Sequence, residues 1–128
     1  PDDLHPLVRP DGVLYPPGHR TVTMADWQPW AERLIAAIRS RGARNLIFVS
    51  GVNWGYDLRG LTLDRYNVVY STHIYRNKGW DWDEAFGHLT QDVPVFAAEW
   101  GGTRYDLAWG RSLASYLDRL SLGWTAWS

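Results

Sequence analysis

The sequence predicts an α/β fold with a parallel sheet, and three observations support this prediction. Short apolar runs alternate with segments of helical periodicity, and strands that are joined through helices pair in parallel. Hydrophobic residues make up 45% of the chain and charged residues 21%, which is typical of a globular chain. The length of 128 residues predicts one domain over 1–128, with a proline-rich loop over 1–21 and βα units over 22–128.

The first element is a helix that we expect from Asp26 to about Arg41. Apolar residues recur there at three- and four-residue steps, at Trp27, Trp30, Leu34, Ile35 and Ile38. With Asp26 as N-cap, Pro29 lies in the first turn, where it removes no hydrogen bond. A capping box that starts at Thr23 is the alternative, but it would place Pro29 deeper in the helix. Gly42 is expected to end the helix.

Four β-rich runs follow. Residues 45–50 are continuously apolar, which is typical of a parallel strand buried on both faces. We expect further strands at 67–75, 94–99 and 123–127, and Pro94 is tolerated because it stands first in its strand.

Loops and helices connect these strands. Residues 51–66 and 76–81 read as loops, 82–91 as a short helix and 106–121 as a helix capped by Asp106. A complete (β/α)8 barrel needs about 250 residues. Four parallel strands in 128 residues therefore predict about half of such a barrel.

The composition favours some classes of function and excludes others. Nine Trp and seven Tyr are far more than a small core can hide, and exposed flat rings suit the C–H faces of sugars. A net charge of −1 excludes a strongly basic nucleic-acid binder. The chain has no Cys, its four His lack metal-ligand spacing, and it contains no phosphate-binding or dinucleotide fingerprint, so we expect no metal and no cofactor. No apolar run approaches the roughly 20 residues of a membrane span.

Glu99 is the strongest candidate for chemistry. It follows an apolar strand at its carboxyl end, and that end of a parallel strand faces the active site in such folds. Strict alternation would put Glu99, Ala97 and Val95 on one face. His73 and Tyr75 would reach the same mouth from the neighbouring strand, and Trp127 from the last one.

The stretches NLIFVSGVNW (45–54), NVVYSTHIY (67–75), PVFAAEWGG (94–102) and GWTAWS (123–128) together resemble strands five to eight of glycoside hydrolase family 5, the cellulase family. The resemblance runs from about Trp27 to the end. It implies that the fold is the C-terminal half, strands 5–8, of a (β/α)8 TIM barrel.

The resemblance also implies a retaining glycosidase with Glu99 as nucleophile. His73 and Tyr75 would belong to the catalytic site, and sugar rings would stack on Trp127, Trp54 and Trp100. Retention needs a second carboxyl about 5–5.5 Å away as acid/base. In the family this is the Glu of an Asn-Glu-Pro motif, which is missing from this chain; Pro1 matches the Pro of that motif.

The expected partner is a β-linked oligo- or polysaccharide, and the resemblance implies an extracellular enzyme. Two alternatives remain: a catalytically incomplete half-barrel, and a carbohydrate-binding or assembly module without turnover. Two open strand edges predict association with the missing half of the barrel or with a second copy. The interior-facing set would include Val69, Val95, Ala97 and Thr125.

Overall fold

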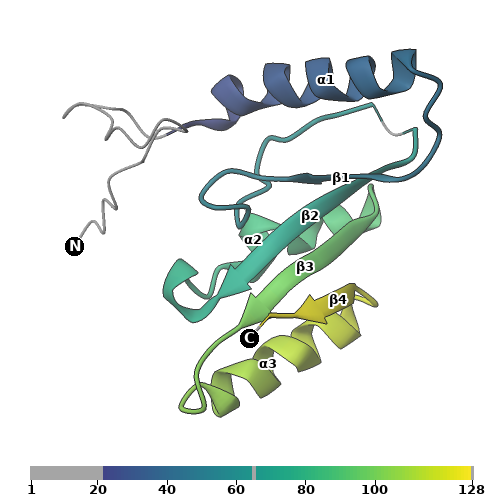
Figure 1. The fold of residues 1–128 in the computed structure, drawn as a ribbon. Coiled ribbons are helices and arrows are strands. Elements are labelled where there is room, and N and C mark those ends of the chain that lie inside the picture. Colours follow the sequence, from purple (N-terminus) through teal and green to yellow (C-terminus); the bar gives the residue numbers. More distant parts are fainter. Residues whose placement is uncertain (1–21, 65, 128) are drawn as a thin grey trace.

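The computed structural model describes residues 22–64 and 66–127, and the loop expected over 1–21 lies outside them (Figure 1). In chain order the elements are α1 (Met24–Ser40), β1 (Ile47–Ser50), β2 (Val68–Tyr75), η1 (Arg76–Lys78), α2 (Trp82–Ala85), η2 (Gly87–Gln91), β3 (Val95–Gly101), α3 (Leu107–Arg119) and β4 (Gly123–Ala126). All four predicted strands are present, and their bounds differ from the predicted ones by at most two residues.

The four strands form one sheet in the order β1-β2-β3-β4, and each neighbouring pair is parallel. Parallel strands end at a common edge of the sheet. We call this edge the rim; it is formed by the last residues of the four strands and the loops that leave them. The topology confirms the predicted fold class, and the rim is where ligands bind in such folds.

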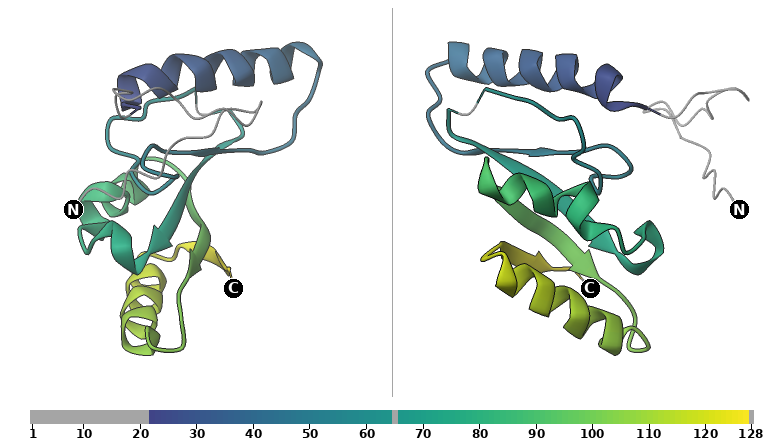
Figure 2. Two further views of the ribbon diagram at one scale, coloured as in Figure 1. Left: turned by 60° about the vertical axis from the view of Figure 1, so that its left-hand side comes forward. Right: turned by 180° about the vertical axis from the view of Figure 1, so that it is seen from behind.

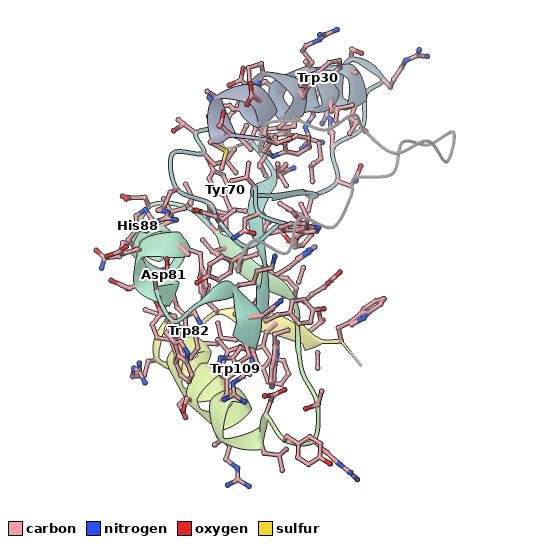
Figure 3. The ribbon with its side chains drawn as sticks, turned by 90° about the vertical axis from the view of Figure 1, so that its left-hand side faces the viewer. Trp30, Tyr70, Asp81, Trp82, His88 and Trp109 are labelled. Atoms are coloured by element: carbon pink, nitrogen blue, oxygen red, sulfur yellow. The ribbon has the colours of Figure 1, made fainter. Side chains whose placement is uncertain are left out.

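The helices α2 and α3 lie on the same side of the sheet, while α1 lies beside β1 (Figures 1 and 2). Trp82 of α2 and Trp109 of α3 pack together, with ring centroids 6.4 Å apart (Figure 3). The core fills the space between the sheet and these helices. Its buried members include Val68, Tyr70, Thr72, Ile74, Val95, Ala97, Phe86, Leu113 and Leu117.

The opposite face of the sheet is concave. Phe48 of β1 and Phe96 of β3 lie on either side of β2, yet their ring centroids are 5.6 Å apart. In a flat sheet, strands two places apart are separated by about 9.5 Å. Side chains that meet across an intervening strand fit a sheet that curves towards this face, as a barrel wall does. Phe48 is 50% exposed, so the inner face of this half barrel is partly open.

A bulge in β3 decides which face Glu99 occupies. Ala97 and Glu99 pair with consecutive residues of β2, so Ala98 is an extra residue. The bulge turns Glu99 to the face of its partner His73, whereas Ala97 is fully buried on the helix side. The prediction that Glu99, Ala97 and Val95 share one inward face is wrong, because alternation fails across an inserted residue.

The helix α1 begins two residues before the predicted start. The backbone N–H and the hydroxyl of Thr23 donate to the Asp26 carboxylate at 3.0 and 2.7 Å. Thr23 is thus the N-cap and Asp26 the third helical residue. The prediction of Asp26 as N-cap is wrong, because the Thr23–Asp26 pair satisfies the helix terminus although it places Pro29 inside the helix.

Only part of the predicted apolar stripe of α1 faces the core. Ala31 and Ile35 are buried and Trp27 packs against the core. The remaining stripe residues are exposed: Trp30, labelled in Figure 3, Leu34 and Ile38. In β1 only Val49 is buried, so the prediction of a strand buried on both faces is wrong. Both elements lie at the β1 edge of the sheet, where Leu34, Ile38 and Phe48 line a shared groove.

Two connecting segments also differ from prediction. The helix expected over 82–91 divides into the short α2 and the 3-10 helix η2. The loop expected over 76–81 contains the 3-10 helix η1. Asp106 occupies the N-cap position of α3, but its side chain makes no capping bond to that helix.

Candidate active site

Glu99 projects at the rim from the carboxyl end of β3. The Tyr75 hydroxyl donates a hydrogen bond to Glu99 Oε2 at 3.0 Å. His73 Nδ1 lies 3.7 Å from the same oxygen, a distance that allows a charge interaction when the imidazole is protonated. The side chain of Glu99 is 33% exposed and so remains accessible to a ligand. The structure thus brings together three residues that the sequence singled out.

The Tyr75 hydroxyl is well suited to remain a hydrogen-bond donor. Burial, followed by its hydrogen bond to Glu99, raises the pKa of Tyr75 above the ordinary value. A neutral phenol can donate to the carboxylate, whereas a phenolate would repel it. The Tyr75–Glu99 contact is therefore a directional restraint on one carboxylate oxygen.

His73 is held from its other side by β1. Ser50 Oγ lies 3.5 Å from His73 Nε2, and the backbone carbonyl of Ser50 accepts a hydrogen bond of 2.8 Å from the indole of Trp27. A chain of contacts thus runs from α1 through the end of β1 to the imidazole. Sequence reasoning missed Ser50, although its place as the last residue of β1, one strand away from His73, was a usable signal.

An ion pair joins two loops beside Glu99. Arg76, directly after β2, pairs with Asp106 at 2.5 Å, and Asp106 also accepts from the backbone N–H of Thr103 at 2.9 Å. The hydrogen bond from Arg76 is the main reason that the pKa of Asp106 lies below its ordinary value. Arg76 and Asp106 line an open hollow of about 470 Å³ together with Tyr75, Asn77, Gly101 and Gly102. Tyr75, whose hydroxyl binds Glu99, is thus part of the lining of this hollow.

Trp54 stands in the loop that follows β1, and its ring is 63% exposed. The Lys78 ammonium lies 3.9 Å from the centroid of the Trp54 ring and donates to Asn53 Oδ1 at 3.2 Å. Burial lowers the pKa of Lys78 below its ordinary value. Loops from two neighbouring strands therefore meet at this tryptophan.

Trp127 and Trp100 occupy a different environment. The backbone N–H of Trp127 donates to the Trp100 carbonyl at 2.8 Å, and the Trp127 side chain is 63% exposed. The Trp100 ring stands edge-on to Trp124 and borders a groove with Gly110 of α3. Trp100 thus packs towards the helix layer, on the face of the sheet opposite to that of Glu99.

Within residues 22–64 and 66–127, no group of three or more His, Cys, Asp or Glu side chains is placed to hold a metal ion. None of the helices in these same ranges is long and apolar enough to cross a membrane.

The fold resembles solved structures of polysaccharide-degrading enzymes. One is the catalytic domain of the major endoglucanase from Xanthomonas campestris pv. campestris, with a TM-score of 0.71 and 21% identity over 89% of this chain and 43% of that chain. Another is a β-mannanase from Thermomonospora fusca in complex with mannotriose, with a TM-score of 0.63 and 22% identity over 82% of this chain and 39% of that chain. These structures are (β/α)8 barrels, and the chain is a partial barrel of the same kind.

Sequence comparison points to the same group. A cellulase from Thermoanaerobacterium sp is 28% identical over 151 aligned positions, which cover 100% of this chain and 39% of the relative. The chain therefore spans less than half the length of the relatives that it matches. The family model for cellulase, glycosyl hydrolase family 5, matches residues 15–128. The chain belongs to the cellulase family, glycosyl hydrolase family 5.

Proposed function

We propose that this chain supplies the nucleophile side of a retaining glycoside hydrolase that acts on β-linked polysaccharide such as a β-glucan. The observation that carries the proposal is the placement of Glu99 at the carboxyl end of β3, with Tyr75 at 3.0 Å and His73 at 3.7 Å from one of its oxygens. A restrained and accessible carboxylate at this position suits covalent catalysis.

In the first step the Glu99 carboxylate attacks the anomeric carbon and forms a glycosyl-enzyme ester. The bond from that carbon to the leaving oxygen breaks, and the acid/base carboxyl protonates the leaving oxygen. In the second step a water molecule, deprotonated by the same acid/base group, attacks the anomeric carbon and frees Glu99. Tyr75 and His73 orient the Glu99 side chain in both steps.

The acid/base carboxyl is not among the residues of this chain in our proposal. Glu32 and Glu84 lie on helices, and retention requires a carboxyl about 5–5.5 Å from the nucleophile. The partner carboxyl would come from the first four βα units of the barrel. Trp127, Trp54 and Trp100 are the proposed sugar-binding residues; of these, Trp54 and Trp127 present exposed rings, whereas Trp100 has the weakest support.

The test uses the barrel completed with its first four βα units and an aryl β-cellobioside as substrate. We expect Glu99→Gln to lower kcat by about 10⁴-fold or more, because the amide cannot attack the anomeric carbon. Glu32→Gln is the matched control and should leave kcat unchanged. For Glu99→Ala, added azide should restore turnover and yield the α-glycosyl azide, since the small nucleophile replaces the missing carboxylate. Retained turnover in pure Glu99→Gln would exclude Glu99 as nucleophile.

A second candidate function is a half-barrel that binds carbohydrate or assembles without turnover. The exposed strand β4 and the exposed apolar residues of α1 and β1 favour it, because open edges and apolar faces invite a partner. The partner would be the missing half of the barrel or a second copy. Binding of cello-oligosaccharide by the chain, without hydrolysis in the completed barrel, would support this function. We also propose an extracellular location, and this proposal rests on membership of the cellulase family alone.

A further inference from the structure

The loop after β1 contains three consecutive residues in the left-handed region of the backbone. Asn53, Trp54 and Gly55 have φ angles of 54°, 56° and 87°. L-residues rarely adopt such angles, and backbone strain of this kind collects at functional sites. The turn is anchored at its base, because Gly51 bridges to Gly55 and Val52 exchanges backbone hydrogen bonds with Asp57.

This turn continues the pairing of β2 beyond the end of β1. The strand β1 ends at Ser50, which pairs with Ser71, so β1 offers no partner to the next part of β2. The backbone carbonyl of Gly55 accepts the hydrogen bond from the His73 N–H at 3.1 Å. On its β1 side, the backbone of His73 is therefore held by the turn and not by a strand, while on the other side His73 pairs with Glu99 of β3.

Gly55 also touches the imidazole ring. A Cβ atom built at Gly55 would lie 2.8 Å from His73 Nδ1 and 2.9 Å from His73 Cγ, closer than real Cβ contacts occur. The crowded atom Nδ1 is the one that lies 3.7 Å from Glu99 Oε2. Ser50 Oγ stands at the other ring nitrogen, 3.5 Å from Nε2. The absence of a side chain at Gly55 is what leaves the ring room beside Glu99.

We propose that Gly55 is a positioning residue, which sets the imidazole of His73 against Glu99 through a backbone hydrogen bond and through its missing side chain. The residue does not touch substrate; it acts through His73. Its consequence for catalysis rests on the proposed role of Glu99 as nucleophile.

The chain provides a closely matched control in the same loop. Gly60 also has a left-handed φ, of 77°, but its nearest neighbour to a built Cβ is Met24 Cγ at 4.0 Å. Gly60→Ala therefore introduces the same backbone strain without a steric contact. Any difference between Gly55→Ala and Gly60→Ala reports the contact with His73.

The first experiment measures the ring ¹⁵N chemical shifts of His73 in this chain, assigned by comparison with His73→Ala. We expect Glu99→Gln to change the Nδ1 shift in the parent and in Gly60→Ala. In Gly55→Ala that change should fall to less than half. An unchanged response in folded Gly55→Ala would overturn the proposal, as would the absence of any response in the parent.

A stability cycle gives a second, independent measurement. If Gly55→Ala alone does not fold, the double variant with His73→Ala should regain a cooperative urea transition, and a double variant that stays unfolded would contradict the proposal. Removal of the ring by His73→Ala should lower the cost of Gly55→Ala to that of Gly60→Ala, measured as the shift of the urea midpoint. A cost that stays the same without the ring would show that Gly55 does not act through His73, and would contradict the proposal.

Kinetics of the completed barrel add the functional readout. A displaced group costs about tenfold to a hundredfold in rate, so Gly55→Ala should lower kcat by that factor while KM stays nearly constant. A loss confined to KM, with an unchanged His73 shift response, would mean that the substitution moved Trp54 instead and would overturn the proposal. If Glu99→Gln left hydrolysis intact, the proposed function would fail, while the chemical-shift test would still decide the link between Gly55, His73 and Glu99.

Discussion

Tyr75 offers a direct test of one hydrogen bond to Glu99. Its hydroxyl donates at 3.0 Å, and Phe keeps the ring while removing that donor. Hydrogen bonds to charged groups contribute about 1.5–3 kcal/mol, so Tyr75→Phe should lower kcat of the completed barrel by about tenfold to a hundredfold. Tyr105→Phe, at an exposed position, should have no effect. Equal rates for the parent and Tyr75→Phe would show that this hydrogen bond does not support catalysis.

His73, Tyr75 and Glu99 could be predicted as neighbours because parallel strands end at one rim. The contacts that hold His73 could not be predicted in the same way. Gly55 reaches it only because a left-handed turn folds back onto β2, and no local pattern specifies that return. The face of Ala97 was mispredicted for a related reason: the bulge at Ala98 is a feature of strand pairing, which periodicity along one strand does not contain.

Pro29 lowers the stability of α1 locally. It is the sixth helical residue, so it removes one interior hydrogen bond of the helix. We expect Pro29→Ala to stabilise the chain by about 1–3 kcal/mol, because Ala restores the N–H donor of this helical residue. The greater conformational entropy of the unfolded chain with Ala offsets part of this gain. Urea unfolding of the chain measures this, with exposed Arg33→Ala as reference. A lower midpoint for Pro29→Ala would show that Pro29 itself stabilises α1.

The ion pair Arg76–Asp106 makes a pH-dependent link between the segments that follow β2 and β3. The pKa of Asp106 is lowered in the folded state, mainly by the hydrogen bond from Arg76. A lowered pKa stabilises the fold above the ordinary Asp pKa of about 3.9, and that contribution disappears as the pH falls through the folded value. Asp106→Asn should therefore lower the urea midpoint more at pH 7 than at pH 3. Equal effects of Asp106→Asn at both pH values would disprove the link.

The boundaries of an element were predicted correctly where one sequence signal dominates. The predictions were wrong where two signals compete. Gly42 follows the end of α1 with a left-handed φ of 79°, as the sequence predicted. At the start of that helix, the preference of Pro29 for the first turn competed with the capping box of Thr23 and Asp26, and the capping box prevailed. The prediction of one helix over 82–91 was wrong, because these ten residues form only one α-helical turn before a 3-10 helix.

At the scale of the whole molecule, the alternation of apolar runs with helical segments predicted the parallel sheet. The chain length predicted that this sheet is about half of a barrel. The sequence did not predict how deeply each side of the sheet is buried, because burial depends on which elements cover each face. The helices α2 and α3 cover one face of β2 and β3, so Tyr70 and Ile74 are buried there. The concave face has no such cover within the described residues, and Phe48 is half exposed although its sequence context is that of a core strand.

The exposed edges lead to a prediction for the chain by itself. At one edge Leu34, Leu46 and Phe48 are about half exposed, and at the other edge every residue of β4 is exposed. Apolar surface contributes about 25 cal/mol per Å² when it is buried, and unpaired strand edges add backbone hydrogen bonds to a partner. We therefore expect sedimentation equilibrium at micromolar concentration to give a mass above the 14.7 kDa of one chain. Phe48→Glu places a charge on the open face and should return the chain towards 14.7 kDa, whereas Arg33→Glu on the surface of α1 should not. A parent chain that sediments as a monomer would show that these edges are stable when exposed to water, and the assembly proposal would then fail for the isolated chain.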